Sequence, residues 1–350
     1  MTKRMSTRNT SRLVAFALTL ALVPSALTAC APSAPAPKPA AAKLKIVAST
    51  SVWGSVIEAI AGDKVQITSI VDNPNQDPHS FEASVRDQAA VNSADLIFTT
   101  GNGYDDFMNP LIKASSQPAS HVVALAANDK TVKPLDSKTV SDPHVWYDFE
   151  IVARIADTIT ARLSKLEPQS ATTFAAANDK FHGQLVKFNA RLKAIATIYR
   201  GCHSVMLKPG DKLCAFVNRT PIVQPESVGL RLLKTFAIDA TPPSVRLAIQ
   251  NESDISVQDM SIIKAEIQGE IVNGLTQFGP YTDVPVRWVV LNDQQTSAQI
   301  EQIKSWVDRN SMNTHIVNFS ETLPSGKTYL TWMSANLAQL EALRSQEVWY

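Results

Sequence analysis

Hydrophobic residues along this chain form short strand-like runs that alternate with stretches of helical spacing. In the first half the strand-like runs lie at 45–50, 65–71, 95–100 and 121–125, and the helix-like stretches at 52–61, 85–93, 108–114 and 148–166. In the second half the strand-like runs lie at 220–223, 286–291 and 315–319, and the helix-like stretches at 228–236, 297–308 and 328–344. Such alternation is typical of parallel sheets covered by helices. We therefore expect the α/β class, with two α/β lobes.

One longer apolar stripe separates the two halves. It begins after Pro168 and runs to about Arg200, with apolar residues spaced by 7, 4, 3, 4, 3 and 3 positions: Phe174, Phe181, Leu185, Phe188, Leu192, Ile195 and Ile198. This spacing predicts a single helix. About 33 residues at 1.5 Å each would span roughly 50 Å, so we expect a strut that joins the two lobes.

The N-terminus has the pattern of an export signal. Four basic residues come first (Lys3, Arg4, Arg8 and Arg12), and an apolar run from Leu13 to Val23 follows. That run is too short to span a bilayer as a helix, and Cys30 stands where cleavage of a signal peptide is expected. The phrase LTAC at 27–30 resembles the bacterial lipobox, in which the cysteine is lipidated. An ordinary cleaved signal peptide with a chance cysteine is the alternative.

These patterns divide the chain into five parts. We predict a signal peptide at 1–29, lipidated Cys30 with a Pro/Ala tether at 30–43, an N-terminal α/β lobe at 44–166, a linking helix at 167–200 and a C-terminal α/β lobe at 201–350. Cleavage would remove four positive charges and lower the net charge from +1 to about −3. With 45% hydrophobic and 19% charged residues, the composition is globular and does not favour nucleic acid as a partner.

Two of the six histidines in the chain, His79 and His144, occur in the same local phrase, DPH. With so few histidines, this repetition is notable. Proline fixes its own φ and disfavours helix for the preceding residue, so each phrase holds its histidine on a loop. Ligands of α/β proteins bind where strands end at a crevice, and neutral imidazole is the commonest metal ligand. The two phrases are therefore candidate metal ligands, with structural histidines after DP turns as the alternative.

At this point the sequence resembles a known family. The stretches VASTSVWGSVIEAIAGDKV, DNPNQDPHSFEASVRDQAAV, ADLIF and GYDDF between Ile46 and Phe107, with DPHVW at 142–146, are similar to TroA-like metal-binding receptors. These are the solute-binding lipoproteins of zinc and manganese ABC importers, and the actinobacterial branch is most similar. The long strut and the ETLP phrase at 321–324, followed by Tyr329, Trp332 and Met333, also resemble the family, so the similarity covers nearly all of 44–342.

The resemblance implies four ligands in the cleft between the lobes, two from each lobe. His79 and His144 carry over directly, and Glu321 fits the carboxylate that follows the last strand. The third ligand follows the first strand of the second lobe, where Glu226 is the candidate in the phrase QPESV. A shift of one residue would instead place Pro225 there, and proline cannot ligate a metal.

The implied function is that of an extracytoplasmic receptor on the cell membrane, a monomer that delivers a divalent metal ion to an ABC permease. Manganese is favoured over zinc because the donor set is rich in oxygen and because the loop at 128–143 has no histidine. The alternative is a metal-binding adhesin or assembly lipoprotein that is not coupled to transport. We do not expect an enzyme, since four protein ligands would close the site and the sequence has no HExxH phrase.

Cys202 and Cys214 lie in a stretch, 201–219, that departs from the family pattern. In an oxidising compartment we expect a disulfide between them. A second metal site formed by these cysteines and His203 is the alternative. The remaining histidines, at positions 121, 182 and 315, are expected to be structural or surface residues.

Replacing the proposed lipid attachment residue tests membrane anchoring. The Cys30→Ala protein should be exported without lipid and be released from the membrane, because nothing else in the sequence is long and apolar enough to hold it there. Fractionation of cells, with metabolic labelling by a fatty acid, makes the comparison. Membrane association equal to that of the wild type would contradict the prediction.

Overall fold

The computed structural model describes one compact unit within Lys43–Tyr350. Within it the described residues are 43–126, 132, 138, 142–198, 202–205, 213–216, 220–234, 237–239, 241–268, 286–309 and 314–346. The predicted signal peptide and all of the tether except Lys43 lie outside this part of the chain. Among the described helices, none has the length and apolar character that crossing a membrane would require.

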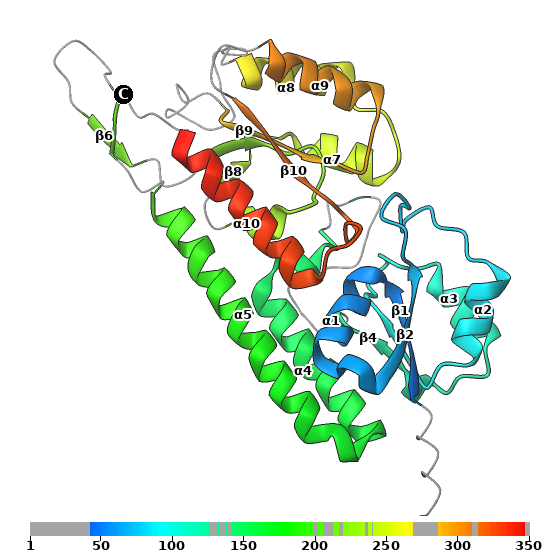
Figure 1. Ribbon diagram of the computed structural model, residues 1–350. Helices are drawn as coiled ribbons and strands as arrows, with labels where there is room; N and C mark the ends of the chain where they lie inside the picture. Colours follow the sequence, from blue (N-terminus) through cyan, green and yellow to red (C-terminus); the bar gives the residue numbers. More distant parts are fainter. Residues whose placement is uncertain are drawn as a thin grey trace, which may run out of the picture. The chain divides into compact units, whose positions relative to one another are not determined.

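The first lobe is a parallel four-stranded sheet of order β2-β1-β3-β4 (Figure 1). Its elements are β1 (Leu44–Thr50), α1 (Ser51–Ala61), β2 (Val65–Val71), α2 (Val85–Asn92), β3 (Leu96–Thr99), α3 (Met108–Ala114), β4 (Val122–Ala124) and α4 (Phe149–Leu166). These bounds agree closely with the pattern of apolar residues. The predicted α/β lobe is therefore confirmed.

The second lobe has its own parallel four-stranded sheet, of order β10-β9-β7-β8. Its elements are β7 (Thr220–Val223), α6 (Leu230–Leu233), β8 (Ala237–Asp239), α7 (Pro243–Gln250), α8 (Val257–Gln268), β9 (Trp288–Asn292), α9 (Ala298–Asp308), β10 (His315–Phe319) and α10 (Tyr329–Gln346). The apolar pattern alone did not indicate β8, α7 or α8.

Alternate residues of each strand face different apolar cores. In β1, Ile46 and Ala48 face a central core, whereas Val47 faces a separate core beneath α2 and α3. In β9, Trp288 and Val290 face the same central core, and Val289 and Leu291 face a third core beneath α7, α8 and α9. Both sheets are thus covered on two sides, as parallel sheets require.

The central core runs without interruption from one lobe to the other. It includes Trp53 of α1, Phe188 of the linking helix, Trp288 of β9 and Trp332 of α10, each buried. Burying large aromatic side chains is among the strongest apolar contributions to folding. The two sheets are therefore attached to one shared apolar layer rather than joined by a free hinge.

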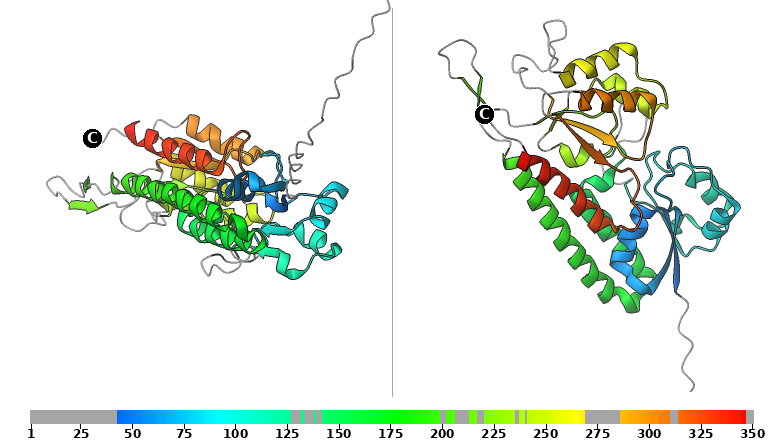
Figure 2. Two further views of the ribbon diagram at one scale, coloured as in Figure 1. Left: turned by 60° about the horizontal axis from the view of Figure 1, so that its bottom comes forward. Right: turned by 45° about the horizontal axis from the view of Figure 1, so that its top comes forward.

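The linking helix α5 (Ala171–Ile198) packs against α1, α4 and α10 (Figures 1 and 2). At 28 residues it is about 42 Å long. Six of the seven residues of its predicted stripe are buried, and the side chain of Ile198 lies outside the described part. The helix begins at Ala171 rather than at Pro168, because a 3₁₀ turn over Pro168–Ser170 precedes it.

A glycine changes the start of helix α6. The pattern predicted a helix over 228–236, but Gly229 has φ +80° and the helix covers Leu230–Leu233. A Cβ at Gly229 would come within 2.3 Å of the Phe319 ring. Glycine is thus needed both for the left-handed backbone and for close approach to β10.

Between α5 and β7 lies an antiparallel pair, β5 (Cys202–Val205) and β6 (Leu213–Phe216). Cys202 is opposite Phe216, and Cys214 is opposite Ser204, so the cysteines occupy diagonal positions of the ladder. Their side chains lie outside the described part, and the disulfide remains a prediction. The residue bounds given above for the five parts of the chain also remain predictions.

Two substitutions on α5 test the shared core. Phe181 is 2% exposed, whereas Val186, five residues further along the same helix, is 67% exposed. Phe181→Ala should lower the free energy of unfolding by about 3–5 kcal/mol because it leaves a cavity. Val186→Ala should change it by less than about 0.5 kcal/mol. Urea unfolding followed by circular dichroism measures both, and equal losses would contradict this role of the stripe.

Candidate metal-binding site

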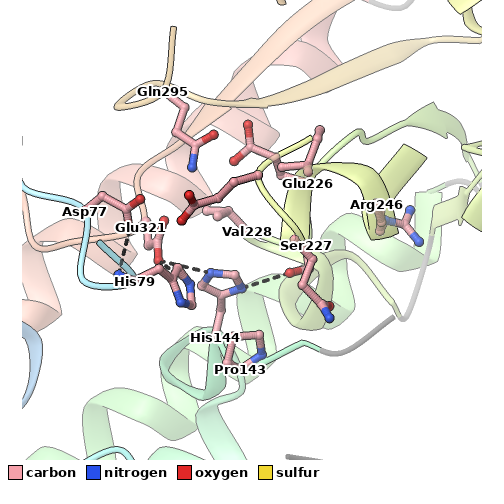
Figure 3. Close-up of a pocket in the computed structure, with 13 residues that line it drawn as sticks. Asp77, His79, Pro143, His144, Glu226, Ser227, Val228, Arg246, Gln295 and Glu321 are labelled. Atoms are coloured by element: carbon pink, nitrogen blue, oxygen red, sulfur yellow. Dashed lines mark hydrogen bonds and ion pairs between the residues drawn. The ribbon is translucent and has the colours of Figure 1, made fainter. Parts of the chain in front are cut away.

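The four predicted ligands line one cavity of about 270 Å³ (Figure 3). His79 lies in the loop after β2, Glu226 in the loop after β7 and Glu321 directly after β10, while His144 precedes the short 3₁₀ turn that leads into α4. The three strands therefore bring their carboxyl ends, where α/β proteins bind ligands, toward the same cavity. This convergence joins side chains separated by up to 242 positions (79 to 321) in the sequence.

The two DPH phrases fold in the same way. Asp77 Oδ1 accepts a hydrogen bond of 2.8 Å from the His79 backbone N–H. Asp142 Oδ1 accepts one of 3.1 Å from the His144 backbone N–H. Each aspartate thus closes a turn over its own proline and fixes the direction in which the histidine leaves the backbone.

Both imidazoles lie next to one carboxylate oxygen. Glu321 Oε1 is 3.3 Å from His79 Nε2 and 3.7 Å from His144 Nε2. One possible ligand atom from each of these residues lies within 4.8 Å of the others. Among the described residues, buried Glu321 Oε1 has no hydrogen bond of ordinary geometry. The donor set and this unsatisfied oxygen fit a divalent cation.

Glu226 lines the same cavity and is 7% exposed, but it does not belong to the cluster of three. Asn292, the last residue of β9, donates to Glu321 Oε2 at 3.5 Å and hydrogen-bonds Glu226. Burial raises the pKa of Glu226 to about 7, against the effect of this hydrogen bond. A nearby cation favours the charged form, so a carboxylate with such a pKa would ionise fully when a metal ion binds. The role of Glu226 as a ligand remains a prediction.

The pKa values of the three clustered residues reflect their mutual attraction. Burial alone would lower the pKa of His144, but Asp142 and Glu321 outweigh it and raise the pKa to about 9. Burial also opposes the charged form of His79, whose pKa is nevertheless raised by Glu321. Burial would raise the pKa of Glu321, and the two histidines instead lower it. Without metal, a proton on His144 therefore supplies positive charge beside the Glu321 carboxylate.

Polar contacts orient the buried histidine. His144 Nδ1 lies 3.1 Å from Asp142 Oδ1 and 3.2 Å from Ser227 Oγ, so Nε2 faces Glu321. Arg231 Nε from α6 lies 3.2 Å from the second oxygen of Asp142. A carboxylate behind a histidine favours the tautomer that presents the opposite nitrogen to a metal.

Two aromatic rings, of Tyr104 and Trp146, pack against the imidazole rings of the site. Tyr104 lies 5.0 Å from His79 and 6.1 Å from His144 between ring centroids, and Trp146 lies 5.3 Å from His144. Both rings are almost completely buried, so they exclude water from one side of the cluster. Sequence reasoning did not identify Ser227, Arg231 or Tyr104 as parts of the site, because these residues are distant in sequence from the groups that they contact.

The other histidines whose side chains are described lie outside this cluster. His121 Nδ1 is 3.3 Å from Gln117 Oε1, and His182 Nε2 is 3.1 Å from the carbonyl oxygen of Ala153. These contacts agree with the expected structural and surface roles. The side chain of His203 lies outside the described part.

Comparisons with known proteins support the resemblance. A family model described as zinc-uptake complex component A, periplasmic (ZnuA), matches residues 46–205. The manganese-binding lipoprotein MntA of Bacillus subtilis is 33% identical over 150 residues, which cover 43% of this chain and 48% of MntA. The match thus spans about half the length of this relative.

Solved structures show the same fold over most of the chain. The periplasmic zinc binding protein TroA from Treponema pallidum has a TM-score of 0.64 at 18% identity, covering 86% of this chain and 99% of TroA. FpvC from Pseudomonas aeruginosa, in complex with Mn²⁺, has a TM-score of 0.62 at 17% identity, covering 87% of this chain and all of FpvC. The predicted two-lobed α/β fold and the resemblance to TroA-like receptors are confirmed.

The raised pKa of His144 predicts a pH-dependent metal affinity. A metal needs neutral imidazole, and at pH 7 a group with a pKa of about 9 is mostly protonated. Metal binding at pH 7 should therefore release protons, and the affinity should increase as the pH rises toward 9. Calorimetric titrations in buffers of different ionisation enthalpy count the protons. An affinity that is constant over this range would be incompatible with the prediction.

The stability of the metal-free protein should show the opposite trend. A histidine whose pKa is raised on folding contributes stability that is complete below its ordinary value of 6.5 and is lost as the pH rises through about 9. The melting temperature without metal should therefore fall between these values. The fall should be smaller in His144→Ala, which lacks the titrating group.

Proposed function

We propose that this TroA-like chain is an exported, lipid-anchored receptor that binds a divalent transition metal ion and delivers it to an ABC import permease. The observation that carries the proposal is the cluster of His79 with the buried residues His144 and Glu321, with Glu226 in the same cavity. MntA and TroA are named for manganese and zinc binding, respectively. In this proposal Cys30 anchors the protein on the extracytoplasmic face of the cell membrane, and it acts there as a monomer.

The ligand set supports capture of an ion rather than catalysis. A catalytic metal keeps an open position for water, whereas four protein ligands close the site. We therefore propose a binding protein and not a metallohydrolase.

Manganese is the ion we propose as the physiological cargo. Two imidazoles and two carboxylates form a mixed set, and oxygen-rich sites suit manganese better than zinc. Carboxylates can also bind through both oxygens, which raises the coordination number. Because zinc binds a given ligand set more tightly than manganese, the purified protein can carry zinc whichever ion the cell imports.

The shared core restricts how the site opens. Closure by wide rotation of the lobes would disrupt contacts of Trp288 and Trp332 with the rest of the central core. We propose that binding instead moves the loops that carry the ligands, above all that of His79, whose side chain is 31% exposed. Small motions then suffice to admit and release the ion.

Loss of a clustered histidine should abolish stabilisation by metal. At a metal concentration one thousandfold above the dissociation constant, binding stabilises the folded protein by about 4 kcal/mol. His144→Ala should eliminate the corresponding rise in melting temperature with Mn²⁺ or Zn²⁺, and Glu226→Gln should reduce it. His182→Ala, which removes a histidine outside the cluster, is the control and should keep the full shift.

Uptake by cells tests transport itself. A strain lacking this protein should import less manganese, measured by mass spectrometry, and the gene should restore uptake when it encodes the wild type but not His144→Ala. Loss of zinc uptake with manganese uptake intact would refute the choice of cargo. Normal uptake of both metals, with altered surface attachment, would favour the adhesin alternative.

A further inference from the structure

The side chain of Gln294 connects the two lobes beside the metal site. We propose that Gln294 is a positioning residue that holds the His79 loop, Asp72–Ser80, against Glu321 and thereby slows release of the metal ion. The inference deepens the proposed function and rests on it, because it assigns the control of release to a residue outside the ligand set.

Gln294 lies in the loop after β9, and its amide forms hydrogen bonds in two directions. The oxygen accepts from the backbone N–H groups of Glu321, at 2.7 Å, and Thr322, at 2.9 Å. The nitrogen donates to the carbonyl oxygen of Pro74, at 2.6 Å, and to Thr322 Oγ1, also at 2.6 Å. One side chain thus binds the backbone of the ligand Glu321 and the backbone of the other lobe.

Thr322 strengthens the same connection. Its hydroxyl donates to the Pro74 carbonyl at 2.9 Å, and the residue is 2% exposed. The Pro74 oxygen therefore accepts two hydrogen bonds from the second lobe. Both hydrogen bonds are partly buried, which makes them stronger than they would be in water.

The His79 loop has few other attachments to the second lobe. Within the described residues, its remaining hydrogen bonds are local, such as Gln76 N–H to the Asn73 carbonyl and His79 N–H to Asp77. Apart from the Pro74 carbonyl, the polar contact between the described residues of this loop and the second lobe is the 3.3 Å pair of His79 with Glu321. Pro74 is thus the fixed point from which His79 reaches the carboxylate.

The two histidines differ in how exposed their side chains are, and this difference explains why the attachment at Pro74 matters for release of the ion. The side chain of His144 is 6% exposed and is held by Asp142 and Ser227, whereas that of His79 is 31% exposed. His79 is therefore the ligand that can leave first. For His79 to leave the ion, its loop must move relative to Glu321. Gln294 opposes this movement because it is hydrogen-bonded both to the loop and to Glu321.

A matched pair of substitutions tests the proposal. Gln299 also exchanges two hydrogen bonds of 2.8 Å with a backbone, that of Ile255, but both residues belong to the second lobe. Gln294→Leu and Gln299→Leu remove the same chemical groups without adding charge. Thr322→Val is a third variant, which removes the second donor to Pro74 and keeps the shape of the side chain.

The measured quantity is the rate at which Mn²⁺ or Zn²⁺ leaves the protein for an excess of chelator in a stopped-flow instrument. Gln294→Leu should release the ion roughly ten- to hundredfold faster, as is typical when a residue supporting a metal ligand is lost. Thr322→Val should change the rate in the same direction by a smaller factor. Gln299→Leu should stay within about twofold of the wild type, and association rates should be similar in all four proteins.

Hydrogen exchange of the metal-free proteins provides a readout that general destabilisation does not produce. Amides of residues 72–80 should exchange faster in Gln294→Leu and Thr322→Val but not in Gln299→Leu. The proposal would be overturned if Gln294→Leu released the ion and exchanged its amide hydrogens at the wild-type rates. It would also be overturned if Gln299→Leu accelerated both processes as much as Gln294→Leu. If Gln294→Leu fails to fold, Thr322→Val decides by the same two measurements. A wild-type protein that binds neither ion would instead refute the proposed function.

Discussion

The apolar layer shared by the two sheets determines where the ligand loops can lie. Trp53, Phe188, Trp288 and Trp332 bring α1, α5, β9 and α10 into one close-packed core. Close packing leaves the sheets little freedom to move apart, so the carboxyl ends of β2, β7 and β10 face one cavity before any ion is present. The site is therefore largely formed in advance, and binding has only to order the loops.

Within that cavity, the arrangement of charge is incomplete without a cation. Glu321 is buried and ionised beside two imidazoles, and its Oε1 has no well-formed hydrogen bond among the described residues. In the metal-free protein, a proton on His144, whose pKa is raised to about 9, offsets the charge of the carboxylate, and Glu321 also raises the pKa of His79. In the proposed function a divalent ion would replace this proton and supply more charge at the same place, so proton release and metal capture would be parts of one exchange.

Two of the polar contacts between the lobes lie beside the two histidine loops. Arg231 reaches Asp142 behind His144, and Gln294 and Thr322 reach the carbonyl of Pro74 in front of His79. The first contact is largely buried and orients a histidine that is already fixed. The contact at Pro74 lies beside the more exposed histidine, His79. There, by our proposal, a modest loss of hydrogen bonding increases the rate at which the ion is released.

Much of this protein follows from local patterns in its sequence. Apolar periodicity identified the strands and helices of the first lobe and the stripe of α5, because a face that must be buried repeats at the period of its own element. The DPH phrases identified His79 and His144, since aspartate and proline set the turn within four residues. The resemblance of the ETLP phrase supplied Glu321.

The tertiary structure decided the features that depend on distant partners. Helix α6 is short and starts after Gly229, because Phe319 of β10 leaves no space for a side chain there. The contacts of four site residues were also decided only by the fold: Asn292, Ser227, Arg231 and Gln294. Their side chains have no periodic signature, because hydrogen bonds between loops are fixed by how two lobes pack and not by the order of neighbouring residues.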